Sequence, residues 1–137
     1  MKKTIVVFSS LFLVYAVAIL TVLSALSTSS CAKAPPNLSP SGVAAFHGTQ
    51  VVKALDLVRD TAIVAEMQQP PLVRTETARA IIVWHRAAVM TIGASPGGWK
   101  PTVSAGLDAI DRALSDSERA TLTPYIALAR TLIAEVQ

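Results

Sequence analysis

Residues 42–67, GVAAFHGTQVVKALDLVRDTAIVAEM, carry apolar side chains at the spacing of an α-helix. Steps of three and four residues place five of them on one stripe: Val51, Leu55, Val58, Ala62 and Ala65. Ser39 or Ser41 is expected to cap the start, because a serine hydroxyl accepts a hydrogen bond from a free N–H of the first turn. Pro70 and Pro71 end the segment, since proline cannot continue a helix. The pattern therefore predicts one long amphipathic helix.

A second helix is predicted over 75–92, with Thr75 as its N-cap and Glu76 favourably placed at the positive end of the helix dipole. Its inner face is expected to comprise Ala78, Ile81, Ile82, His85, Val89 and Ile92. Gly93 is expected to end it. Residues 94–101 hold two prolines and two glycines, which predicts a loop.

A third helix is predicted over 102–114, because apolar residues recur there at steps of four, three and four. These residues are Val103, Leu107, Ile110 and Leu114. Ser115 and Glu118 form a capping-box pattern, so a new helix starts at this point. Thr123–Pro124 is expected to break and restart it, with Pro124 at the first position of the new segment.

The final segment is expected to turn one side inward: Tyr125, Leu128, Leu132 and Val136. No alternating strand pattern of useful length occurs anywhere in the chain. Short connections between amphipathic helices favour antiparallel packing. The sequence therefore predicts an all-α fold, a small antiparallel bundle of about four helices over 42–137 with the third and fourth short. Its Ala- and Val-rich stripes predict close helix packing.

The N-terminus predicts membrane insertion. Lys2 and Lys3 are followed by Ile5 to Leu26, which are 22 residues without a charge. A helix of that length is roughly 33 Å long, enough to span a bilayer. Because positive residues stay on the cytoplasmic side, the rest of the chain is expected to be membrane-anchored and extracytoplasmic, on the periplasmic or cell-surface side.

Small residues, Ser27 to Ser30, run directly into Cys31. Together with the basic start and the apolar core, this resembles bacterial lipoprotein precursors over residues 1–34, although Thr28 stands where they usually carry leucine. The resemblance implies a signal sequence over 1–30 and a lipidated Cys31, whose acyl chains would anchor the protein. Two other fates stay open: an uncleaved transmembrane anchor, and an ordinary signal cleaved near Ala25 and Ser27.

Residues 31–41 contain three prolines, which oppose a continuous helix and predict a tether between membrane and bundle. Removing Lys2 and Lys3 from the 12 basic residues leaves 10 against 9 acidic ones. This near-neutral balance offers no basic patch, so no nucleic-acid partner is expected. Cys31 is the only cysteine, which excludes an internal disulfide and a cysteine-based zinc site.

The histidines and paired carboxylates are expected to be structural. His85 lies on an apolar stripe with no further ligand one turn away, which favours a packed ring with one hydrogen bond over a metal ligand. His47 belongs to no recognised motif. The pairs Asp56 and Asp60, and Asp108 and Asp111, are expected to form local ion pairs with the nearby Arg59 and Arg112. No catalytic residue, metal or cofactor is expected.

Trp99 lies in the Gly/Pro loop, where its ring either covers the core or points outward as a partner contact. Trp84, inside the second helix, is expected to pack against a neighbouring helix.

The leading functional expectation is a non-enzymatic cell-envelope protein, bacterial or phage-encoded, with a structural or interaction role. Its partner would be another envelope protein or a cell-wall component. Two alternatives stay open. One is a module that binds a small apolar ligand in a cavity around His85, and the other is a single-pass transmembrane protein of a lysis or exclusion system.

Overall fold

The structure, a computed structural model, describes residues 33–95 and 98–136. Within them the chain forms four helices and no strand: α2 (Pro40–Glu66), α3 (Thr75–Ala94), α4 (Lys100–Ala113) and α5 (Asp116–Glu135). These helices belong to one compact unit, Ala34–Gln137. The predicted all-α fold is therefore confirmed, whereas the N-terminal hydrophobic helix expected within 1–30 lies outside the described residues.

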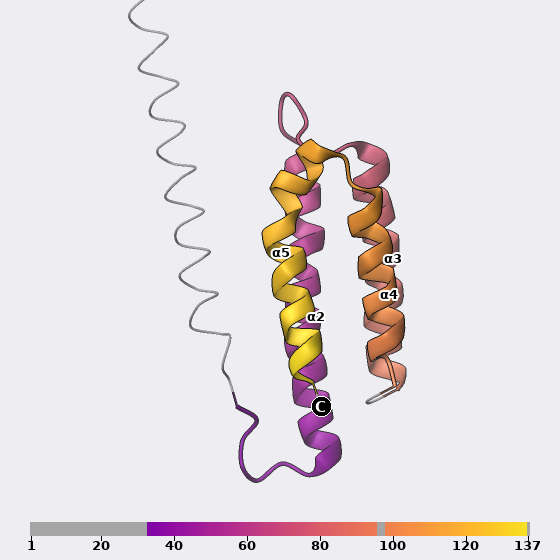
Figure 1. Cartoon of the computed structure of the whole chain (residues 1–137). Coiled ribbons are helices and arrows are strands. Elements are labelled where there is room, and N and C mark those ends of the chain that lie inside the picture. Colours follow the sequence, from indigo (N-terminus) through magenta and orange to yellow (C-terminus); the bar gives the residue numbers. More distant parts are fainter. Residues whose placement is uncertain (1–32, 96–97, 137) are drawn as a thin grey trace, which may run out of the picture. The chain divides into compact units, whose positions relative to one another are not determined.

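Each helix packs against two others, in the cyclic order α2, α3, α4, α5. Consecutive helices run in opposite directions (Figure 1), as short connections favour. The longest helix, α2, lies against both α3 and α5, and the shortest, α4, completes the opposite corner. The described residues of the unit Ala34–Gln137 thus form an up-and-down bundle with one shared core.

Ser39 caps α2, as predicted. Its hydroxyl accepts a hydrogen bond from the Gly42 N–H at 3.2 Å. The helix nevertheless begins at Pro40, two residues before the predicted boundary, because proline is well suited to the first helical position, where its missing N–H is not needed. The predicted tether therefore ends at Ser39, after a turn that the Leu38 N–H closes on the Pro35 carbonyl at 3.2 Å.

Buried side chains follow steps of three and four along each helix, which is the pattern of bundle packing. On α2 the predicted stripe is confirmed in full. On α3 the buried residues are Ala78, Ile81, His85, Ala88 and Ile92. The prediction for Ile82 was wrong, because the buried seam of α3 is narrow and Ile82 lies just outside it, 40% exposed. On α5 the fully buried stripe includes Leu122, Ile126 and Ile133, while Tyr125 and Leu128 only flank the core.

Two predicted ends of α3 differ from the structure. Arg74, not Thr75, occupies the N-cap position, and the Thr75 hydroxyl instead binds Glu66 Oε1 at 2.8 Å. Gly93 does not end the helix, which continues to Ala94. Alanine after glycine allows one more helical residue, and the Gly/Pro loop begins only afterwards.

The break predicted at Thr123–Pro124 is also wrong, since α5 continues through Pro124. The fourth helix therefore has 20 residues and is not short as predicted, whereas the third, α4, is short with 14. Proline removes one N–H, whose acceptor in the helix would be the Ala120 carbonyl. Pro124 and Ala120 both lie on the exposed side of α5, so water can hydrate that carbonyl. Leu122 and Ile126 meanwhile hold the same turns against the core.

Two glycines permit close helix contacts. A Cβ added at Gly106 of α4 would lie 2.0 Å from Trp84 Nε1 on α3, and one at Gly48 of α2 would lie 3.0 Å from Ile92 Cγ2. Trp84 therefore packs against the neighbouring helix, as predicted. A Cβ at Gly93, by contrast, would meet nothing within 4 Å.

These contacts predict opposite effects of two Gly→Ala substitutions. Gly106→Ala should lower the free energy of unfolding by about 1–3 kcal/mol, because the rigid Trp84 ring must move to admit the methyl group. Gly93→Ala should raise it by about 0.5 kcal/mol through helix propensity alone. Urea titrations of both variants measure the difference, and equal stabilisation by both would contradict the packing described.

Candidate functional site

His85 lies at the edge of the core between α2 and α3. Its Nε2 is 2.8 Å from Asp56 Oδ1, within hydrogen-bonding distance. The same oxygen accepts a contact from Arg59 Nη1 at 3.0 Å, and Arg59 also pairs with Asp60 at 2.8 Å. The expected packed ring with one hydrogen bond is confirmed, and so is the local pairing of Arg59 with both aspartates.

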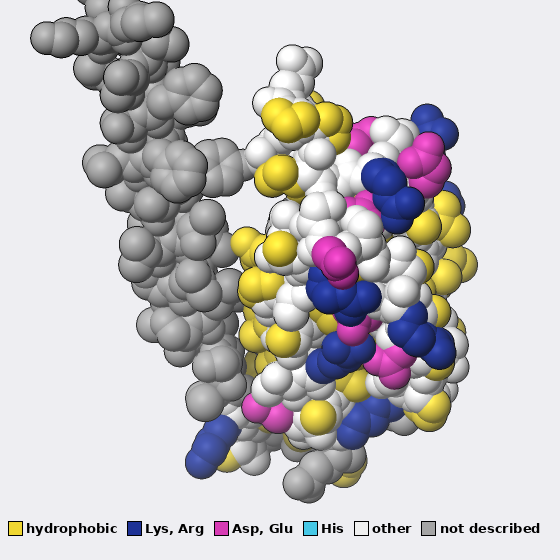
Figure 2. All heavy atoms as spheres, turned by 45° about the horizontal axis from the view of Figure 1, so that its top comes forward, with side chains coloured by type: hydrophobic (Ala, Val, Ile, Leu, Met, Phe, Trp, Pro, Cys, Tyr) yellow, Lys and Arg dark blue, Asp and Glu magenta, His cyan; other side chains and the backbone are white. Residues whose placement is uncertain are grey.

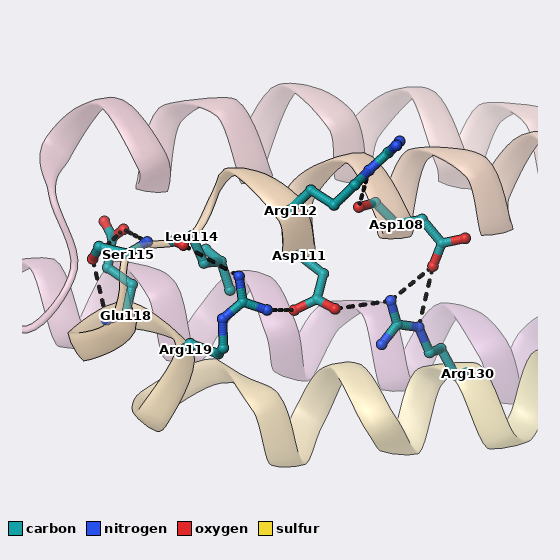
Figure 3. Close-up of polar contacts among 8 residues, drawn as sticks. All are labelled: Asp108, Asp111, Arg112, Leu114, Ser115, Glu118, Arg119 and Arg130. Atoms are coloured by element: carbon teal, nitrogen blue, oxygen red, sulfur yellow. Dashed lines mark hydrogen bonds and ion pairs between the residues drawn. The ribbon is translucent and has the colours of Figure 1, made fainter.

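Asp108 and Asp111 find their charged partners on α5, not at Arg112. Arg130 Nη2 lies 2.7 Å from Asp108 Oδ1 and 3.0 Å from Asp111 Oδ2, and Arg119 Nη1 lies 2.9 Å from Asp111 Oδ1 (Figure 3). Arg112 donates only to the Asp108 backbone carbonyl. The expected local pair with Arg112 is wrong, because α5 brings two arginines across the helix interface.

Figure 2 shows acidic and basic side chains interspersed on the face of the bundle that is turned to the viewer. Arg130 and Asp108 are about half exposed, and such exposed pairs contribute little stability. Each of the four charged side chains, Asp108, Asp111, Arg119 and Arg130, lies within contact distance of an opposite charge. These ion pairs link α4 to α5 along their exposed boundary.

Glu118 is the one charged side chain that the described part of the chain buries almost completely, at 1% exposure. Its Oε1 accepts from the Arg74 backbone N–H and from Arg74 Nε, both at 3.0 Å. Its Oε2 accepts from Arg74 Nη2 at 2.9 Å, and from the Ser115 N–H and hydroxyl at 2.8 Å each. The predicted capping box is confirmed, and the arginine from the α2–α3 connection adds to it.

Burial alone raises the pKa of Glu118, because a charged carboxylate loses hydration there. The hydrogen bonds from Arg74 and Ser115 outweigh this effect and hold the pKa well below the ordinary value of a glutamate. Glu118 is therefore ionised at neutral pH and acts as a structural anion. A general acid would need a raised pKa, so its environment is the opposite of the one that such a role requires.

Trp99 occupies the N-cap position of α4 and is 1% exposed. Of the two alternatives open from the sequence, the structure has the ring covering the core. In this conformation the indole offers no surface to a partner. Lys100, the next residue, donates from Nζ to the Val136 carbonyl and thereby joins the start of α4 to the end of α5.

His47 lies on α2 with its ring against Phe46, the ring centroids 5.7 Å apart in an edge-on arrangement.

Residues 33–95 and 98–136 contain no group of three or more metal-ligating side chains. Over the same described ranges, no helix has the length and hydropathy needed to cross a bilayer. Cys31, the predicted lipidation site, lies outside the described residues.

A shallow apolar groove of about 350 Å³ separates α2 from the last turns of α3. It is lined by Ala44, Ala45, Gly48, Thr49, Val52, Val89, Ile92 and Gly93. Small side chains line it, and a Cβ at Gly93 would meet nothing within 4 Å. His85 is not among its lining residues, so this groove is not the cavity around His85 expected from the sequence.

Comparison of the chain with family models, curated proteins and solved structures finds no match. The function is therefore inferred from the residues of this chain alone.

The Glu118 contacts predict a pH-dependent loss of stability. Glu118→Gln should lower the free energy of unfolding at pH 7 by about 2 kcal/mol, since the amide keeps the shape but loses the charge that Arg74 pairs with. Because the pKa of Glu118 is lowered by folding, its contribution is complete above the unfolded pKa of about 4.3 and fades as the pH falls below that value.

Chemical unfolding of the wild type, Glu118→Gln and Asp116→Asn between neutral and acid pH tests this. Asp116 is an exposed acid in the same first turn and serves as the matched control. The gap between the wild type and Glu118→Gln should narrow as the medium becomes acidic. A gap that stays constant with pH, or one that Asp116→Asn reproduces, would contradict the role of Glu118.

Proposed function

We propose that this chain is a non-enzymatic, membrane-anchored protein that holds its helical bundle on the extracytoplasmic side of a membrane. The observation that carries the proposal is the order of features in residues 1–40. Lys2 and Lys3 precede 22 uncharged residues, the only cysteine follows, and α2 begins nine residues later at Pro40. This order suits a domain tethered close to a lipid surface.

The polar residues of the bundle support a structural or interaction role. The carboxylates of Asp56, Asp108, Asp111 and Glu118 each accept contacts from a basic side chain. These contacts occupy the carboxylates within the bundle, and the one that is buried is Glu118. The proposed partner is another envelope protein or a cell-wall component, met by the surface of the bundle.

We further propose that Cys31 carries the anchor as a lipidated residue, in line with the resemblance of residues 1–34 to lipoprotein precursors. An uncleaved transmembrane segment, as in a lysis or exclusion protein, is the alternative. The two anchors differ in chemistry, because only lipidation modifies the cysteine and is accompanied by removal of residues 1–30.

Metabolic labelling with radioactive palmitate in a bacterial host separates these anchors. Wild type should incorporate label, and Cys31→Ser should not, while Ser30→Ala serves as a matched control with the cysteine intact. Loss of label in Cys31→Ser together with its larger apparent mass supports lipidation. Equal labelling of wild type and Cys31→Ser would end the lipoprotein proposal, and membrane retention of an unlabelled chain would favour the transmembrane anchor.

The groove between α2 and α3 favours one second candidate, the binding of a small apolar ligand. Its volume of about 350 Å³ is at the lower end of the range for ligand sites. Gly93→Leu places a side chain where no atom lies within 4 Å, whereas Ala94→Leu changes a neighbour that does not line the groove.

A fluorescent fatty acid titrated into each variant tests the ligand proposal. Gly93→Leu should weaken binding about tenfold by filling part of the groove, and Ala94→Leu should bind like wild type. Absence of saturable binding, or equal affinity in both variants, would remove this candidate.

A further inference from the structure

The outward side of α3 carries a narrow stripe of arginine and apolar residues. We name this stripe the α3 outer stripe; it consists of Arg79, Ile82, Val83, Arg86 and Met90, all exposed. The steps of three, one, three and four residues keep them on one side of the helix. Val83 and Met90, about two turns apart on this side of the helix, are 70% and 67% exposed.

The arginines of the α3 outer stripe differ from the others in the described part of the chain. Arg59, Arg74, Arg119 and Arg130 pair with carboxylates, and Arg112 donates to a backbone carbonyl. Arg79 and Arg86 make no hydrogen bond or ion pair with the other described residues. The stripe itself contains no acidic residue. Glu76 lies one turn before Arg79, whereas Arg86 has no carboxylate one turn away on α3. The stripe thus presents two positive charges interleaved with exposed apolar side chains.

We propose that the α3 outer stripe seats the bundle side-on against the anionic surface of a lipid bilayer. Basic and apolar side chains combined on one helical face suit the boundary between headgroups and acyl chains, where the charges meet lipid phosphates and the apolar groups enter the bilayer edge. A second copy of the chain is a poorer fit, because like stripes would bring arginines together without a carboxylate between them.

The short tether favours a lipid surface as the partner of the α3 outer stripe. This step of the inference rests on the proposed membrane anchor. Nine residue steps from Cys31 to Pro40 span at most about 30 Å, so the start of α2 stays within that distance of the proposed anchor point. The last turns of α3 lie beside the first turns of α2, where Ile92 meets Gly48, so the Met90 end of the stripe is near the tethered end. A tether this short raises the effective concentration of the lipid surface around the bundle. Even a weak contact between the α3 outer stripe and lipid is then enough to hold the bundle against the bilayer.

Photocrosslinking of the full chain, inserted in vesicles, tests which surface meets lipid. A photoreactive phenylalanine analogue replaces Val83, and the control replaces Ala127, an exposed residue of α5, which lies diagonally across the bundle. The vesicles contain phosphatidylcholine alone or phosphatidylcholine with phosphatidylglycerol. The probe at position 83 should label lipid several-fold more than the probe at 127, mainly in the anionic vesicles and less at high salt.

Two double variants distinguish the effect of the two arginines in the stripe from the effect of the net charge of the bundle. Arg79→Gln/Arg86→Gln should reduce lipid labelling at position 83 about 25-fold, since each arginine contributes roughly a factor of five. Lys53→Gln/Arg112→Gln removes the same charge from α2 and α4 and should leave labelling at position 83 within about twofold of wild type.

Vesicle flotation in the same samples reports the anchor independently. A chain that floats but labels lipid equally from positions 83 and 127 overturns the inference and leaves the anchor intact. Labelling of a second copy or of another protein from position 83, in place of lipid, also overturns it. A chain that fails to float contradicts the proposed anchor itself.

Discussion

The buried Glu118 carboxylate is the contact on which the arrangement of the bundle depends. A carboxylate can be buried only if hydrogen bonds replace its lost hydration, and here Arg74 and Ser115 provide five of them. Arg74 ends the connection from α2 to α3, and Ser115 ends the connection from α4 to α5. The Glu118 carboxylate thus joins the two connections at the same end of the bundle. It thereby sets how the α2–α3 pair packs against the α4–α5 pair.

Small residues set the distance between the helices once that end is fixed. Gly48 and Gly106 allow Ile92 and Trp84 to approach neighbouring backbones closely, and alanines occupy much of the remaining interface. Such packing needs only a narrow seam on α3, which leaves the large side chains of Val83 and Met90 outside it. The apolar surface on α3 thus lies apart from the core, and the proposed contact with lipid would cover it.

Much of the fold was predictable because its signals are local. The α2 stripe, the Ser39 cap and the Ser115–Glu118 capping box each depend on residues a few positions apart, and all three are confirmed. The break at Pro124 was wrong because the cost of a proline depends on whether the freed carbonyl reaches water, and the sequence alone does not fix which side of α5 is exposed.

The polar contacts were less predictable for a related reason. Arg130 lies 22 residues from Asp108, and Arg74 lies 44 residues from Glu118, so neither pair leaves a pattern in a single sequence. Trp99 allowed two orientations until the core was in place. In the sequence, the exposed arginines of α3 are only two positions on a predicted helix. That they contact no carboxylate is known only from the structure, in which each of the other described arginines contacts a carboxylate or a backbone carbonyl.

The proposed anchor and the proposed lipid contact both require the bundle to lie outside the cytoplasm, and a topology reporter fused after Gln137 tests this location most directly. Alkaline phosphatase needs disulfides that form only in an oxidising compartment, whereas β-galactosidase is active only in the cytoplasm. The account predicts an active phosphatase fusion and an inactive galactosidase fusion, both in the membrane fraction. An active galactosidase fusion with an inactive phosphatase fusion would contradict it.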